Sequence, residues 1–121
     1  MEQAETRRCC GRCTSSSWPH PLTESFDHAL FHTIVGTLEQ NGHRVTATDL
    51  YREGFQPAMT VRERETYMDN EYDDSAVASY VETLKAVDGV NLCFPPWWFS
   101  MRAMLKGWVD RVWGAGYRVR L

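Results

Sequence analysis

LCFPPWWFSMRAMLKGWVDRVWGAGY, residues 92–117, is the stretch from which the fold is read. It opens on the end of an apolar run, turns at a Pro-Pro pair, and presents Trp97, Trp98 and Phe99 before apolar residues at helical spacing. That order predicts a strand, an aromatic loop and the beginning of a helix. Open α/β sheets bind nucleotides and flat ring cofactors beyond the carboxyl ends of their strands. The stretch therefore indicates an α/β sheet with a ligand site at this loop.

Composition restricts the class of protein. The chain has 121 residues, 43% of them hydrophobic and 24% charged, which fits one domain with a single core. A formal net charge of −3 gives no electrostatic case for a nucleic-acid partner. The sequence has no apolar run long enough to span a membrane and no hydrophobic signal segment near residue 1. We therefore expect a cytoplasmic protein.

The four cysteines raise the question of a metal site. Cys9, Cys10 and Cys13 lie close together in RRCCGRC, whereas a zinc site usually needs a second pair of ligands at a defined spacing. Cys93 lies in an apolar run and is expected to be a small buried residue. We expect reduced thiols and no metal, with a zinc-binding regulator as a low-ranking alternative.

Hydrophobic periodicity predicts two helices and two strands before the aromatic loop. Ser25 and Gly42 suit the N-cap and the C-terminal stop of the first helix. The apolar stripe expected on that helix is Phe26, Leu30, Ile34 and Leu38, with Ala29 and Val35 beside it. The predicted elements are a helix over 25–40, a strand over 43–50, a helix over 75–86 and a strand over 88–94.

Two further segments have patterns with an ordinary structural explanation. Residues 61–74 are strongly charged, and we interpret them as a solvated helix and loop rather than as an acidic recognition face. Beyond the aromatic loop, an apolar stripe at helical spacing is expected to pack in the core. Its members are Met101, Met104, Leu105, Trp108, Val109 and Val112.

The same chain resembles the flavodoxin-like NAD(P)H:quinone oxidoreductases over residues 20–116. Residues 94–112 are similar to that family's F-P-L-x-W-F-x-x-P-A-x-x-K-G-W-x-[DE]-R-V segment. His20 and Pro21 followed by Ser25 and Phe26 resemble its H-P-x-x-x-S-F-N. Residues 42–57 resemble G-H-x-V-x-x-x-D-L-Y-x-x-x-F-D-P. These runs are specific and occur in the family's order.

The resemblance implies a flavodoxin-like α/β sandwich of three layers with a parallel sheet. It implies a flavin, FMN or FAD, that passes hydride from NAD(P)H to a quinone or similar small-molecule acceptor, and a possible homodimer. The implied cofactor-binding residues are His20, Ser25, Phe26, Pro95, Pro96, Trp97, Trp98 and Phe99. It implies no catalytic acid, base or nucleophile among the residues present, because the flavin carries out the redox step.

Three departures from the family pattern lead to further expectations. Residues 1–19 are expected to be an irregular, non-family segment that gives only a poor, degraded first strand, because serines cannot supply the burial of Val, Ile or Leu. The partial domain is expected over 20–117, with a tail at 118–121 and with the family's later strands missing. An alternative is therefore a truncated, inactive fragment or a binding module of the same fold. Asp27 stands where many members have Asn, which should weaken anion binding.

Overall fold

Three parallel strands form the centre of the protein in a computed structural model that describes residues 12–17 and 24–114. The strands are β1 (Arg12–Ser17), β2 (Arg44–Asp49) and β3 (Gly89–Cys93), in the order β2-β1-β3. Each connection between parallel strands contains helix, as parallel pairing requires. The described residues therefore form the α/β sheet that residues 92–117 predicted.

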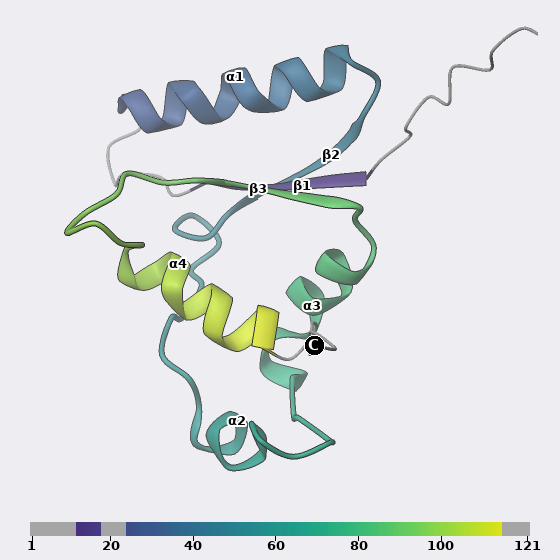
Figure 1. Ribbon diagram of the computed structural model, residues 1–121, viewed down its shortest axis with the longest axis vertical. Coiled ribbons are helices and arrows are strands. Elements are labelled where there is room, and N and C mark those ends of the chain that lie inside the picture. The colour runs from purple at the N-terminus through teal and green to yellow at the C-terminus, as the bar shows by residue number, and fades with distance from the viewer. Residues whose placement is uncertain (1–11, 18–23, 115–121) are drawn as a thin grey trace, which may run out of the picture.

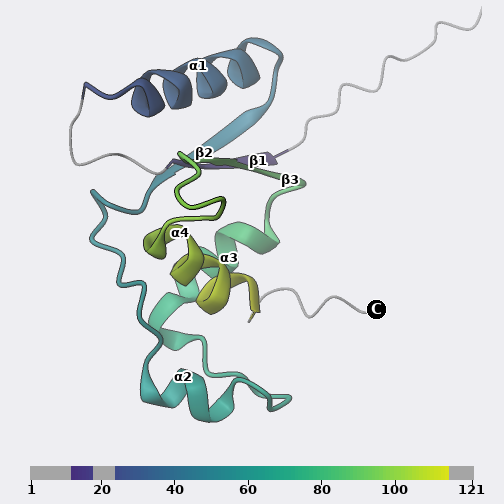
Figure 2. The ribbon, with the colours of Figure 1, turned by 60° about the vertical axis from the view of Figure 1, so that its left-hand side comes forward.

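Helices cover both faces of this sheet. Helix α1 (Phe26–Gln40) lies on one face, and α3 (Ala78–Lys85) and α4 (Ala103–Trp108) lie on the other, which gives three layers (Figures 1 and 2). A short 3₁₀ turn, η1 (Ser75–Val77), leads into α3, and a π-helical turn, η2 (Val109–Trp113), continues α4. Helix α2 (Val61–Thr66) lies on the side of α3 and α4 that faces away from the sheet.

The first strand occupies the central position expected of it. Arg12–Ser17 pairs with β2 on one side and with β3 on the other, although its serine-rich sequence predicted a poor strand. Strand pairing uses backbone N–H and C=O groups, which serine supplies as well as valine does. The domain boundaries proposed near residues 19 and 117 stay predictions.

The main core lies between the sheet and the helices of the α3 and α4 layer. Its buried members are Leu50, Phe55, Val77, Val81, Leu84, Leu105, Trp108 and Val112. The expected stripe after the aromatic loop supplies Leu105, Trp108 and Val112, so that prediction is confirmed for its buried half. Cys93 is also buried, as expected. Among the described residues, no helix is long and apolar enough to cross a membrane.

Helix α1 keeps its predicted limits but not its predicted buried face. Ser25 is the N-cap and Gly42 has φ +85°, the left-handed conformation that suits a glycine after a helix. Phe31 is the buried residue of the helix, whereas Phe26 is 80% exposed and Leu30 is 40% exposed. The stripe prediction is therefore wrong for the first turns of α1.

The charged segment before α3 is less solvated than its composition predicted. Thr60 caps α2 by accepting a hydrogen bond from the Glu63 N–H, and the Glu63 side chain accepts one from the Thr60 N–H in return. Glu63 and Thr66 are both buried. Two polar side chains of α2 thus belong to the interior.

Candidate functional site

The candidate site lies at the carboxyl edge of the sheet. The strand register places Ser17 opposite Asp49 on one side and opposite Cys93 on the other, so all three strands end at the same level. From β1 the chain crosses to β2 through α1 on one face, and from β2 it crosses to β3 past α3 on the other face. Connections therefore diverge between β1 and β3, and such a switch point is where open α/β sheets bind ligands.

The N-terminus of α1 lies at this edge. Ser25 has extended backbone, and its Oγ accepts a hydrogen bond from the His28 N–H at 3.3 Å. The N–H groups of a first helical turn have no partner within the helix, and together with the helix dipole they favour an anion. One carboxylate, that of Asp27, also lies in the first turn and opposes this preference.

A sulfur contact joins α1 to the end of β3. The Cys93 thiol lies 3.8 Å from the Asp27 carbonyl oxygen, to which it donates a weak hydrogen bond. Burial raises the pKa of the Cys93 thiol, and the nearby Asp27 charge raises it further. The thiol therefore stays protonated at neutral pH and anchors the two elements instead of acting as a nucleophile.

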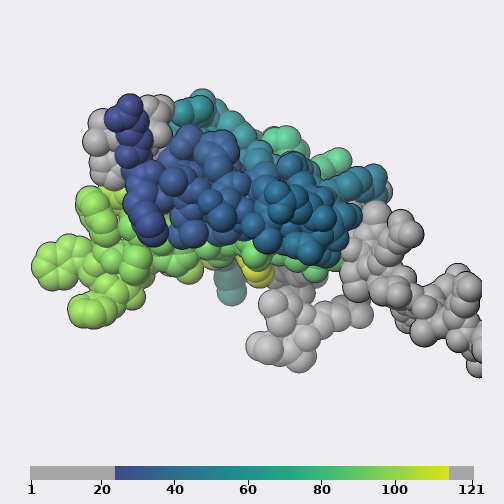
Figure 3. All heavy atoms as spheres, turned by 90° about the horizontal axis from the view of Figure 1, so that it is seen from above, coloured from purple at the N-terminus to yellow at the C-terminus, as the bar shows by residue number. Residues whose placement is uncertain are grey.

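The segment that follows β3 exposes three aromatic rings beside the N-terminus of α1. Trp97 is 53% exposed, Trp98 is 92% exposed and Phe99 is fully exposed. In Figure 3 the green segment after β3 projects outward at the end of the sheet where α1 begins, and Figure 1 shows that it continues into α4 on the other face. Large rings that contact so little of their own protein offer apolar surface to a ligand or a second chain.

The backbone of this aromatic segment is strained. Trp98 has φ +53° and Phe99 has φ +61°, and the Ser100 N–H donates to the Trp97 carbonyl at 3.1 Å. Two left-handed residues in a turn normally call for Asn or Gly, since each L side chain costs about 1–2 kcal/mol there. Strain of this kind concentrates at binding sites. The sequence predicted an aromatic loop at these residues, but their pattern did not predict a turn with left-handed backbone.

The structure brings most of the predicted cofactor residues to one edge. Ser25 and Phe26 begin α1, and Pro95 to Phe99 follow β3, whose last residue, Cys93, contacts the first turn of α1. His20 lies outside the described residues. Within the described part of the chain, no group of three or more His, Cys, Asp or Glu side chains is placed to hold a metal ion. Cys9 and Cys10 lie outside the described residues, and so does the side chain of Cys13.

Comparison with known proteins identifies the family. The family model for the flavodoxin-like fold matches residues 18–120. The chain belongs to this flavodoxin-like family. The match confirms the fold that residues 92–117 predicted.

Individual relatives agree with this assignment. An uncharacterised NAD(P)H oxidoreductase of Escherichia coli, YcaK, is 37% identical over 101 residues, which cover 82% of this chain and 51% of that protein. The human ribosyldihydronicotinamide dehydrogenase (quinone) is 29% identical over 116 residues, which cover 83% of this chain and 50% of that protein. The chain thus spans about half the length of the curated relatives it matches.

A solved structure shows the same architecture. An NAD(P)H:quinone oxidoreductase from Methanothermobacter marburgensis superposes with a TM-score of 0.75 at 28% identity. The match covers 88% of this chain and 56% of that one. The resemblance to the flavodoxin-like quinone oxidoreductases is therefore confirmed for the part of the family that this chain covers.

Arg102 departs from the family pattern and has a clear structural role. It stands where the family resemblance has Pro, and its guanidinium carbon lies 3.7 Å from the centre of the Trp97 ring. This cation–π contact fixes one face of Trp97 at the exit of the aromatic turn. Arg102 is also the N-cap residue of α4, where its side chain makes no capping hydrogen bond. The sequence alone did not predict this stacking.

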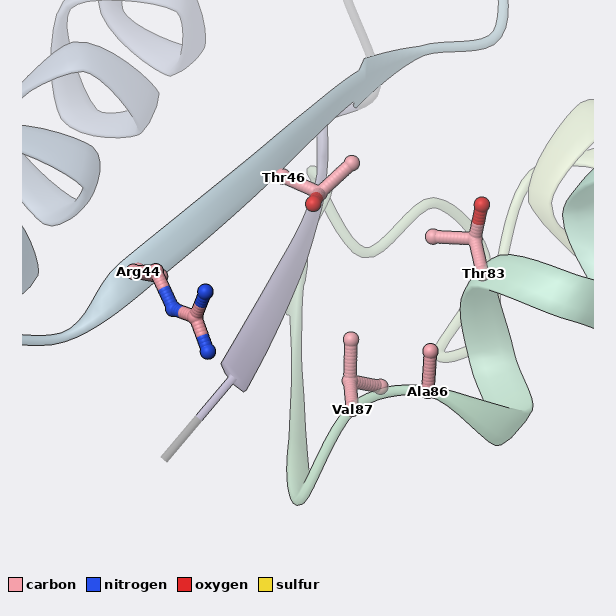
Figure 4. A pocket seen from close by; sticks show the side chains of 5 residues that line it. All are labelled: Arg44, Thr46, Thr83, Ala86 and Val87. Atoms are coloured by element: carbon pink, nitrogen blue, oxygen red, sulfur yellow. The ribbon is translucent and has the colours of Figure 1, made fainter. Parts of the chain in front are cut away.

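A cavity lies elsewhere, at the amino edge of the sheet (Figure 4). Its volume is about 300 Å³, and Arg44, Thr46, Thr83, Ala86 and Val87 line it. Arg44 begins β2, whereas the switch point lies where the strands end. The carboxyl edge is the better candidate site. It combines the switch point between β1 and β3, the exposed aromatic rings and the N-terminus of α1, whereas the cavity lies at the opposite edge.

Proposed function

We propose that this protein binds a flavin, FMN or FAD, at the carboxyl edge between β1 and β3, and that it serves NAD(P)H-dependent reduction of a quinone or similar acceptor. The observation that carries the proposal is the exposed aromatic turn of residues 97–100, with Trp98 and Phe99 in left-handed backbone, at the edge of the sheet where the end of β3 contacts the first turn of α1. The proposal includes the homodimer that the family resemblance implies, and the cytoplasmic location that the sequence analysis expected.

The residues at this edge fit a flavin. A flavin phosphate needs N–H donors, which the first turn of α1 offers, and a planar ring needs a flat apolar surface, which the exposed aromatics offer. His20, Ser25 and Phe26 would hold the phosphate. The residues that would hold the ring portion are Pro95, Pro96, Trp97, Trp98 and Phe99.

The protein's part in the reaction would be binding and orientation. A bound flavin supplies the hydride-accepting and hydride-donating chemistry. The aromatic turn would position the ring and exclude water from one of its faces. We assign no catalytic acid, base or nucleophile, and the raised pKa of Cys93 argues against that thiol in such a role.

Relatives supply the hydride donor and the acceptor in this proposal. The E. coli relative is named an NAD(P)H oxidoreductase, and the human and Methanothermobacter proteins carry quinone in their names. Since the chain covers about half of each, activity in this chain is part of the proposal. The alternative is a protein of the same fold that binds no flavin.

Loss of the most exposed tryptophan tests the site. The full chain should elute from a sizing column with stoichiometric FMN or FAD, detected by visible absorbance. Trp98→Ala should weaken flavin binding roughly tenfold or more, because ring stacking is worth about 1–3 kcal/mol. Met68→Ala removes an apolar side chain that is 78% exposed on another part of the surface, and it should bind flavin as the unmodified chain does. A folded chain that elutes without flavin would favour the alternative.

Removing the carboxylate of Asp27 tests the phosphate end of the site. Asp27→Asn should tighten FMN binding about two- to fivefold, because one negative charge leaves the positive end of the α1 dipole. Riboflavin, which has no phosphate, should bind both forms equally. Glu39→Gln removes the same charge near the other end of α1 and should change neither affinity. An equal gain for riboflavin would contradict the phosphate assignment.

A further inference from the structure

Two histidines of α1 face each other one helical turn apart. The Nε2 atoms of His28 and His32 are separated by 3.2 Å, and their ring centres by 4.3 Å. Because the nitrogens are closer together than the rings, the two Nε2 edges are turned toward each other. His28 is half-buried and His32 is exposed, so solvent reaches the pair.

This spacing suits two ligands of one metal ion. Transition metals bind imidazole nitrogen at about 2.0–2.1 Å, so nitrogens 3.2 Å apart subtend an angle of about 100° at the metal. That angle lies between the right angle of square-planar or octahedral sites and the tetrahedral angle. Histidines at i and i+4 on one helix face are also the pair that the helical H-E-x-x-H zinc motif uses.

We propose that His28 and His32 form a bidentate site for a divalent transition-metal ion, Cu²⁺, Ni²⁺ or Zn²⁺. Imidazole is the ligand type that these ions accept, whereas Mg²⁺ and Ca²⁺ prefer oxygen. Since no described group of three His, Cys, Asp or Glu side chains completes a set, water would fill the other coordination positions. His32 is exposed and His28 is half-buried on α1, which is the outer layer on its face of the sheet (Figure 2), so solvent water can reach the ion.

The metal ligands are different atoms from those proposed for the flavin phosphate: the metal would be held by imidazole Nε2 atoms and the phosphate by backbone N–H groups of the first turn of α1. A metal held by residues 28 and 32 would link the first and second turns of α1, and the His28 N–H is itself the donor to the Ser25 cap. Metal binding should therefore stabilise the beginning of this helix. By mass action, an ion that binds only the folded chain raises its melting temperature.

Calorimetric titration of the full chain with Ni²⁺ tests the proposal. Accessible thiols should first be alkylated, because Cys9, Cys10 and Cys13 offer sulfur ligands of their own. The unmodified chain should bind one equivalent more tightly than His28→Gln or His32→Gln by roughly 100-fold, since a chelate gains effective concentration that one imidazole lacks. His43→Gln removes a histidine outside α1 and should change nothing.

Two further readouts separate a metal site from a structural role of the histidines. Far-UV circular dichroism should show equal helix content in all variants without metal, and Ni²⁺ should raise the melting temperature only where both histidines are present. Affinity should follow the order Cu²⁺ above Ni²⁺ above Mn²⁺, with no response to Mg²⁺. Unchanged Ni²⁺ binding in the two single variants would overturn the proposal, and so would a helical chain that binds no Ni²⁺. A hydrogen bond between the two imidazole rings would then account for the 3.2 Å distance.

Discussion

Replacing Gly107 with alanine is expected to destabilise the fold by about 3 kcal/mol, at the upper end of what overpacking usually costs. Gly107 is buried in α4, and a Cβ atom there would lie 2.5 Å from both Cα and Cβ of Pro57. It would also collide with the Pro57 carbonyl oxygen. These are atoms of the backbone and of a proline ring, so no side-chain rotation relieves the overlap. Either α4 or the loop before α2 must move away from the core.

Urea unfolding of the full chain measures this effect, with a second glycine as the control. Gly36 lies inside α1, and a Cβ atom there meets nothing within 4 Å. Gly36→Ala should therefore raise stability by about 1 kcal/mol, since alanine has the higher helix propensity. If the free energy of unfolding falls for Gly107→Ala and rises for Gly36→Ala, the loss of stability comes from the contact with Pro57. Equal small effects would show that α4 and the loop are not tightly packed.

Much of this fold could be predicted because its signals are local. Ser25 as a cap, Gly42 after the helix and the strand over 88–94 each depend on neighbouring residues, and the structure places all three within a residue of the prediction. Parallel strands bring their carboxyl ends to one edge, so the positions of Ser25 and the aromatic loop followed from element order. The resemblance to the family then predicted the flavodoxin-like arrangement of these elements.

What the sequence did not reveal depends on partners far along the chain. Glu63 lies in a charged run and was interpreted as solvated, yet its partner Arg111 is 48 residues away and both are buried. Phe31, rather than Phe26, is the buried side chain of α1, and only the position of the helix on the sheet decides this. Periodicity within one element carries no information about such contacts.

Breaking the buried ion pair between Arg111 and Glu63 is expected to cost at least as much stability as the Gly107 substitution. The Nε atom of Arg111 donates to the Glu63 carboxylate at 2.9 Å, and the two side chains are 5% and 1% exposed. The second carboxylate oxygen accepts from the Thr60 N–H at 2.6 Å, and Arg111 also donates to the Gln56 carbonyl. The pair thus joins α2, the loop before it and η2.

Glu63→Gln should cost about 3 to 5 kcal/mol, because it leaves the Arg111 guanidinium buried without an opposite charge. Arg111→Met should cost a similar amount, because it leaves the Glu63 carboxylate buried without a positive charge beside it. The double variant should lose less than the sum of the two, since each single change contains the penalty of the abandoned partner. Asp110→Asn breaks the exposed ion pair with Lys106 and should cost under about 1 kcal/mol.

The pH dependence of unfolding gives this pair a separate signature. Burial alone would raise the pKa of Glu63, but the hydrogen bonds from Arg111 and Thr60 outweigh it and hold the pKa below its ordinary value of 4.5. The folded state therefore binds the proton less readily than the unfolded chain. The stabilisation that this contributes is complete above about pH 4.5 and is lost as the pH falls below that value toward the folded-state pKa.

Urea midpoints measured from pH 7 to pH 3 should fall more steeply for the unmodified chain than for Glu63→Gln, which has no proton to bind at that position. Parallel curves would mean that Glu63 titrates alike in the folded and unfolded states, and the ion pair would then contribute packing without the electrostatic stabilisation derived from its geometry.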